Sequence, residues 1–147
     1  ISKTITDGSI EELFIYSVNG TGKQVTNFGS ENIQYANIGF ISWSLDSRYL
    51  AFWVKIDQDK NNSLFVYDIQ NDSLADYCLP GDYGGQLPIV VGITDHFTAP
   101  LWSPDGSKIL ITKRDEDNIF CTILFSLDQK KAMIIAGDGW PVGWVKK

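Results

Sequence analysis

The sequence has few of the residues from which catalytic and metal centres are most often built. Its 147 residues include one histidine, two cysteines and one methionine. A single histidine excludes paired histidine ligands and the H-E-x-x-H zinc motif, and no G-x-S-x-G nucleophile elbow occurs. We therefore expect that this chain is not an enzyme by itself.

Basic residues and long apolar runs are also scarce. Lys and Arg number 12 against 18 Asp and Glu, which gives a net charge of -6. Nucleic-acid binding needs a clustered basic surface, so a nucleic-acid partner is excluded. No apolar run approaches the roughly 18 residues that a membrane-spanning helix needs, so we expect no membrane span.

The two cysteines say little about a disulfide. Cys78 and Cys121 fall on strands of two different predicted repeats, and a bridge between them would need an uncommon approach of strand edges. We expect two buried or half-buried thiols.

The strongest positive feature is a sequence repeat. Residues 43–52 read W-S-L-D-S-R-Y-L-A-F and residues 102–112 read W-S-P-D-G-S-K-I-L-I-T. Each is followed about twenty residues later by a second matched segment, at 64–69 and at 121–127. A repeat of this length built only from strands is typical of β-propeller blades.

Two partial copies flank the complete ones. Residues 13–20, L-F-I-Y-S-V-N-G, match residues 64–71, L-F-V-Y-D-I-Q-N, position for position. Residues 140–144 align with 39–43, the segment that precedes the first tryptophan turn. We therefore expect the chain to open partway through one blade and to close after starting another.

Residues 98–110, T-A-P-L-W-S-P-D-G-S-K-I-L, resemble the repeat of the TolB-type (WD-repeat-like, PD40-type) β-propeller family. In the copy at 43–47 the proline and glycine of that motif are absent. Families with this repeat include periplasmic scaffolds and the propeller lids of prolyl oligopeptidases, so the resemblance implies a fold and leaves the function open. It also implies a periplasmic or extracellular location.

The predicted fold is all-β, with antiparallel four-stranded propeller blades, two complete and one split between the termini. Residues 1–147 form a single propeller segment: a partial blade at 1–27, blades at 38–78 and 99–136, and the first strand of a further or split blade at 140–147. The predicted strands are Ser2–Thr6, Glu12–Ser17, Lys23–Thr26, Ile38–Trp43, Tyr49–Ile56, Ser63–Ile69, Asp72–Cys78, Ala99–Trp102, Lys108–Arg114, Ile119–Leu127 and Ala132–Ile135.

The longest connection, Pro80–Thr98, predicts a binding face. It exceeds ordinary loop lengths, and long loops on a rigid scaffold often carry function. Its histidine, beside an acidic residue, could serve proton transfer or bind a metal, or it could be a solvent-exposed loop residue. The aromatic side chains on this face could grip a peptide or a sugar. The candidate binding residues are Tyr83, Asp95, His96, Phe97 and Trp140.

The segment D-Q-D-K-N-N-S has the alternate oxygen spacing of a calcium loop, with Asp57, Asp59 and Asn61 as candidate ligands. The turn glycine is missing, and Asp68 stands where a bidentate glutamate is needed. A solvated hairpin tip explains the same residues. No other cofactor is indicated.

Trp43, Trp102 and Trp144 recur at one place in successive repeats, which predicts packing between blades before ligand stacking.

Two functions and one assembly follow as expectations. The chain is either an interaction module that binds a protein or peptide, or the propeller part of a larger hydrolase that gates or presents substrate. About three blades cannot close a ring, since propellers typically have four to eight. We expect a head-to-tail dimer that closes a six-bladed ring, with 140–145 of each copy beside Ser2–Thr6 of the other, or else the remainder of a longer propeller.

Overall fold

The computed structural model of this chain describes residues 2–7, 9–31, 33–56, 62–77, 100–114, 119–139 and 141–145. Within these ranges the chain forms strands and one short 3-10 helix, which confirms the predicted all-β class. The strands are β1 (Ser2–Asp7), β2 (Ile10–Tyr16), β3 (Gly22–Gln24), β4 (Ala36–Trp43), β5 (Tyr49–Ile56), β6 (Asn62–Asp68), β7 (Ser73–Tyr77), β8 (Leu101–Trp102), β9 (Lys108–Arg114), β10 (Phe120–Ser126) and β11 (Lys131–Ala136). The 3-10 helix η1 (Phe28–Ser30) follows β3.

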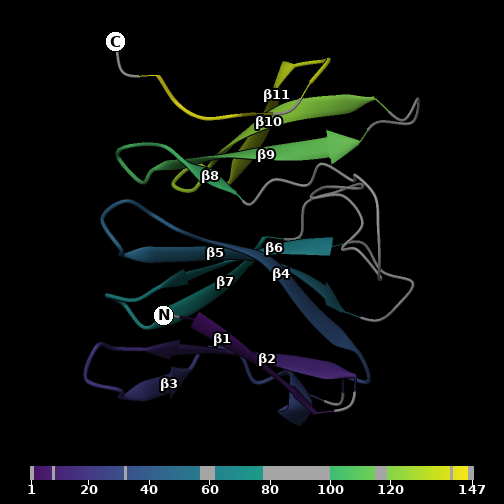
Figure 1. Cartoon of the computed structure of the whole chain (residues 1–147). Coiled ribbons are helices and arrows are strands. Elements are labelled where there is room, and N and C mark those ends of the chain that lie inside the picture. The colour runs from purple at the N-terminus through teal and green to yellow at the C-terminus, as the bar shows by residue number, and fades with distance from the viewer. Residues whose placement is uncertain are drawn as a thin grey trace.

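The strands form three layers that are stacked on one another (Figure 1). The first layer has the order β1-β2-β3, the second β4-β5-β6-β7 and the third β8-β9-β10-β11, and neighbours within each layer are antiparallel. Every strand end lies within two residues of its predicted position. The alternation of strands and turns in the sequence therefore predicted this topology.

One pairing differs from the purely antiparallel prediction. Ile10 of β2 pairs in parallel with Ala36 of β4, and the Ala36 amide donates to the Ser9 carbonyl at 3.0 Å. This single bridge joins the first two layers into one seven-stranded sheet. Ile10 also pairs with β1 and Ala36 with β5, so the bridge gives partners to backbone groups on the free edges of these two strands.

The second layer is buried on both faces, because side chains along a strand alternate between the two sides of a sheet. On β5, Leu50, Phe52 and Val54 pack toward the first layer. Ala51 and Trp53, which alternate with them, pack toward the third layer. All five are at most 1% exposed, so β5 is an almost continuous apolar run at the centre of the molecule.

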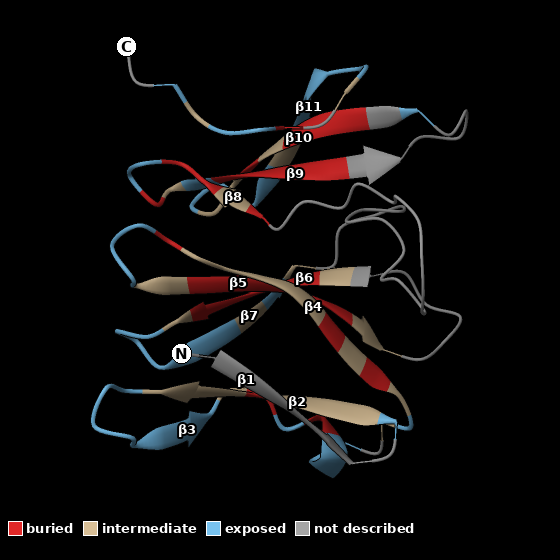
Figure 2. Ribbon diagram, in the orientation of Figure 1, coloured by how far each residue is buried: buried red, intermediate tan, exposed pale blue. Residues whose placement is uncertain are grey.

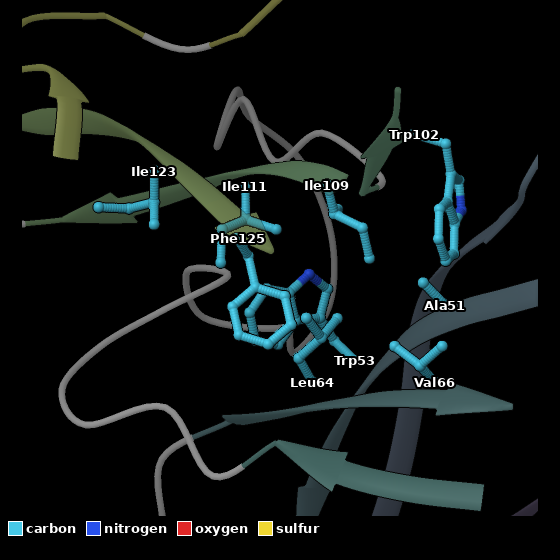
Figure 3. Packing of buried hydrophobic residues seen from close by; sticks show 9 residues of the cluster. All are labelled: Ala51, Trp53, Leu64, Val66, Trp102, Ile109, Ile111, Ile123 and Phe125. Carbon is cyan, nitrogen blue, oxygen red and sulfur yellow. The ribbon is translucent and has the colours of Figure 1, made fainter. Parts of the chain in front are cut away.

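The interface between the second and third layers is a close-packed apolar cluster (Figure 3). Trp53 of β5 is 1% exposed and faces the isoleucines of β9 and the side chain of Phe125 on β10. Burying a large apolar side chain contributes roughly 1.5–3 kcal/mol. The cluster comprises Ala51, Trp53, Leu64, Val66, Trp102, Ile109, Ile111, Ile123 and Phe125.

The last strand of each layer is the exposed one. β3, β7 and β11 carry mostly exposed side chains, whereas β5, β6, β9 and β10 are largely buried (Figure 2). This order, from buried inner strands to an exposed outer strand, is the arrangement of propeller blades. The described part contains no helix long and apolar enough to cross a membrane.

The turn after Trp102 is held by its own polar side chains. The Ser103 hydroxyl donates to Asp105 at 2.5 Å and accepts from the Lys108 amide at 3.0 Å. The Ser107 amide donates to the same carboxylate at 3.1 Å. Gly106 has φ +69°, a left-handed conformation that glycine adopts without steric cost.

The turn after Trp43 repeats this pattern without the glycine. The Ser44 hydroxyl donates to Asp46 at 2.6 Å and accepts from the Tyr49 amide at 2.8 Å. The Arg48 amide donates to the same carboxylate at 3.1 Å. Ser47 holds the position of the glycine with φ +58°, so the two turns have the same backbone although their sequences differ.

Candidate functional site

The residues predicted to bind a partner or calcium lie outside the described residues. They are Tyr83, Asp95, His96, Phe97 and Trp140 on the predicted binding face, and Asp57, Asp59 and Asn61 at the predicted calcium loop. In the part of the chain that the structure describes, no group of three His, Cys, Asp or Glu residues could hold a metal ion. Both sites therefore stay predictions.

The residues on either side of the long connection are described and firmly packed. β7 ends at Tyr77, whose ring meets the Phe125 ring edge-on at a centroid distance of 4.9 Å and an angle of 69°. The next described residue, Pro100, is among the fully buried ones. The 22 residues between them thus start and end on a rigid scaffold.

The cysteine prediction is partly covered. Cys121 on β10 is 5% exposed, and its thiol approaches the Gly137 carbonyl at 3.8 Å. This confirms a buried thiol at that position, while Cys78 lies outside the described residues.

Within the described residues, a pocket of about 300 Å³ opens between the first and second layers. Its lining is mainly apolar and comes from β2, β3, the turn between them, the end of β4 and the residue after β6. The lining residues are Ile15, Tyr16, Ser17, Thr21, Lys23, Trp43 and Ile69.

The pocket and Tyr77, the last described residue before the long connection, lie at opposite ends of β7. The pocket is at the edge where Ser17, Thr21 and Ile69 form turns. β7 runs from that edge to Tyr77 over five residues, or about 16 Å at roughly 3.3 Å per residue. The turns that join β2 to β3 and β4 to β5 lie together on the left side in Figure 1.

One basic group stands at the rim of the pocket. Lys23 forms an ion pair with Asp72, and its ammonium lies 5.8 Å from the centre of the Tyr67 ring. The Tyr67 hydroxyl donates to the same carboxylate at 2.7 Å. The hydrogen bond to Asp72 raises the pKa of Lys23, and the bond from Lys23 lowers the pKa of Asp72. Lys23 is therefore charged but already paired.

Trp102 is buried against the preceding layer by a stacked ring and a hydrogen bond. Its ring is 7% exposed and stacks on Tyr49 of the preceding layer at 5.7 Å, with 14° between the planes. Its indole N–H donates to the Ser42 carbonyl at 3.1 Å. The prediction that the repeated tryptophans pack between blades is confirmed at this position.

Trp144 makes the same hydrogen bond one repeat later. Its indole N–H donates to the Leu101 carbonyl at 3.0 Å. Ser42 directly precedes Trp43, and Leu101 directly precedes Trp102. Each tryptophan thus binds the carbonyl of the residue that precedes the tryptophan of the previous repeat.

Trp43 stands at the start of this series and lines the pocket. No described residue accepts a hydrogen bond from its indole N–H, and its side chain is partly exposed. Ser2 pairs with Ile15 as Ala51 pairs with Val66, so Ser2 holds the place of Ala51 in the first layer.

Sequence reasoning found the tryptophans but missed the pocket. Ile15, Tyr16 and Ile69 read as ordinary strand residues, and nothing in their spacing indicates a cavity. The available signal was the register: aligning the repeats shows which contacts of Trp102 are not repeated at Trp43.

The sequence matches no protein-family model and no curated protein. Among solved structures, the chain is similar to TolB from Acinetobacter baumannii, with 16% identity and a TM-score of 0.59 over 94% of this chain and 30% of that one. It is also similar to the AtxE2 isopeptidase in its apo form, with 22% identity and a TM-score of 0.58 over 75% of this chain and 20% of that one. The chain spans less than a third of either structure. The likeness shows a TolB-like β-propeller fold.

Proposed function

We propose that this chain is a non-enzymatic interaction module that binds a protein or peptide through the connection at 80–98. The observation that carries the proposal is the anchoring of that connection. Tyr77 packs against the apolar cluster between the second and third layers, and Pro100 is fully buried. A long loop that leaves and re-enters a rigid scaffold is where binding residues are commonly found.

The composition of the connection supports a peptide or protein ligand. It contributes Tyr83, Asp95, His96 and Phe97, which combine aromatic surface with polar groups. Aromatic side chains dominate the energetics of protein interfaces, and a few polar groups orient the ligand.

A random peptide library displayed on phage tests this function. Peptides selected on the 147-residue chain are expected to bind at least about tenfold more weakly to the Tyr83→Ala and Phe97→Ala variants, because each loses an aromatic anchor. The melting temperature is expected to stay nearly unchanged. Affinity is measured by titration calorimetry or fluorescence anisotropy with the synthetic peptide.

The matched control is Leu45→Ala. Leu45 is 75% exposed and lies in the turn between β4 and β5, at the other end of the strands. It should leave peptide affinity unchanged. Peptides that bind the variants of the connection as well as the unchanged chain would contradict the proposed binding face.

A second function is favoured by one comparison. One of the similar solved structures is an isopeptidase, and this chain covers 20% of it. The chain could therefore be the propeller part of a larger hydrolase that gates or presents substrate to a catalytic domain. An α/β-hydrolase segment with a nucleophile elbow in the same open reading frame would favour this alternative over the interaction module.

The cellular location and the oligomeric assembly are each proposed from a single argument. The periplasmic or extracellular location rests on the resemblance of residues 98–110 to the TolB-type repeat. The head-to-tail dimer rests on the expectation that about three blades leave a ring open.

A further inference from the structure

We propose that the pocket beside Trp43 is a docking site for residues 141–145 of a second copy of this chain, with the Trp43 indole N–H donating to the Gly143 carbonyl of that copy. The site lies at the opposite end of β7 from Tyr77, the last described residue before the connection at 80–98. The proposal rests on the head-to-tail dimer proposed above, and it does not depend on peptide binding by the connection at 80–98.

The acceptor follows from the series of tryptophans. Trp102 binds the carbonyl before Trp43, and Trp144 binds the carbonyl before Trp102. If Trp43 follows the same pattern, its indole N–H donates to the carbonyl of a residue that precedes another tryptophan of this repeat. Three described tryptophans hold the repeated position, namely Trp43, Trp102 and Trp144. Of these, Trp144 is the one whose preceding carbonyl, that of Gly143, accepts from no described tryptophan.

The strand register agrees with this assignment. In the second layer Ser42 lies opposite Ala51, and in the third layer Leu101 lies opposite Leu110. These are the residues that precede each tryptophan and their partners on the next strand. In the first layer Ser2 holds the place of Ala51, since Ser2 pairs with Ile15 as Ala51 pairs with Val66.

A strand is missing from that register in the described part of the first layer. β1 pairs with β2, and no described strand lies on its other edge. Unpaired strand edges readily accept a further strand. The register therefore places Gly143 of the second copy opposite Ser2.

Residues 141–145 are mostly exposed and pair with no strand in the described part of the chain. They form no strand within the chain, although Trp144 occupies the inner position of the repeat. Val142 is 89% exposed and Val145 is 91% exposed. An inner strand needs a second strand beside it, which β1 of another copy supplies.

The contact can be made twice by two identical chains. Residues 141–145 of each copy would dock beside Trp43 and β1 of the other, so one two-fold axis satisfies both sites. Two copies of three layers would give six, which falls within the usual range of four to eight blades.

Size-exclusion chromatography with light scattering, over a dilution series, tests the docking. We expect a dimer of twice 16.5 kDa that dissociates on dilution. Trp43→Phe keeps an aromatic ring and removes the donor, so the dimer should weaken by about fivefold per site. Trp43→Ala should weaken it by at least about thirtyfold. The matched control Leu45→Ala lies two residues from Trp43, outside the pocket lining, and should leave dimerisation unchanged.

A second measurement follows solvent exchange in the unchanged chain. In the ¹⁵N spectrum of the unchanged chain, the Trp43 indole N–H is assigned by its absence in Trp43→Phe. Its exchange with solvent should be slow at concentrations where the dimer forms and fast after dilution. A chain that stays monomeric, or a dimer that is indifferent to both Trp43 variants and leaves this N–H unprotected, would overturn the proposal.

Discussion

The second layer, β4–β7, and the third layer, β8–β11, begin with the same tryptophan turn but differ in what surrounds the tryptophan. Trp102 is stacked on Tyr49 and hydrogen-bonded to Ser42. Trp43 lines an open pocket, and no described residue accepts its indole hydrogen. The side chains that follow the two tryptophans make nearly the same hydrogen bonds.

The difference shows that a residue of this repeat receives its environment from the preceding layer. Tyr49 and Ser42 belong to the second layer, and they complete the seat of a tryptophan in the third. In repeat proteins each unit contacts only its neighbours, so one sequence motif can be buried in one copy and open in the next.

The largest expected difference concerns the two tryptophans themselves. Trp102→Ala should lower the free energy of unfolding by about 3–5 kcal/mol, because it leaves a cavity in a packed interface. Trp43→Ala should cost the monomer less than about half of that, because the ring already borders open space. Urea denaturation at a concentration below dimer formation measures both. Equal losses would contradict the comparison.

The left-handed turn position gives the next effect. Gly106→Ala should lower the free energy of unfolding by about 1 kcal/mol, because an L-residue is strained at positive φ. Ser47→Gly, at the same place in the other turn, should raise it by up to about 1 kcal/mol. Thermal denaturation of both variants measures the difference. A loss of stability in Ser47→Gly would show that Ser47 makes a compensating contact.

The turn carboxylates predict a dependence on pH. Hydrogen bonds from Ser103 and then Ser107 lower the pKa of Asp105 to about 2, and a bond from Ser44 lowers the pKa of Asp46. An unfolded Asp titrates near 3.9, so the stabilisation from Asp105 is fully present above about pH 4 and is lost as the pH falls through about 2. The stabilisation from Asp46 is lost in the same direction, as the pH falls through its lowered pKa.

Melting temperatures between pH 5 and pH 2 test that dependence. The melting temperature of Asp105→Asn should fall less steeply over this range than that of the unchanged chain. Asp46→Asn should show a smaller change in the same direction. An unaltered slope in Asp105→Asn would mean that the carboxylate titrates at its ordinary pKa in the folded protein.

The smallest expected effect is that of calcium on the melting temperature, which should depend on the loop at 57–61 and not on the loop at 115–118. We propose that Asp57, Asp59 and Asn61 bind calcium weakly, so millimolar calcium should raise the melting temperature by a few degrees at most. Asp57→Asn should abolish the rise, whereas Asp117→Asn in the second loop should not. A melting temperature that neither calcium nor a chelator changes would remove this site.

Much of the fold could be predicted from local pattern. The alternation in Tyr49–Ile56 and Lys108–Arg114 reproduced those strands without error, because strand period and turn chemistry act over a few residues. The parallel bridge of Ile10 to Ala36 could not be predicted, since it joins residues that meet only after two layers have packed.

The two candidate sites also differ in how far they can be predicted from the sequence. The length of the connection at 80–98 and its aromatic residues are visible in the sequence, and their role as a binding face stays a prediction. The pocket beside Trp43 is built by Ile15, Lys23 and Ile69 from separate strands and turns. Their positions in the sequence do not show that these side chains border one cavity.

By itself the sequence determined the all-β class, the strands and the tryptophan turn, because these depend on side-chain alternation and on hydrogen bonds between near neighbours such as Ser103 and Asp105. Only the tertiary structure decided which face of each strand meets which layer, and therefore that Trp102 is enclosed and Trp43 is open. The physical reason is that burial is a property of the interface between layers, and half of each interface comes from residues distant in the chain.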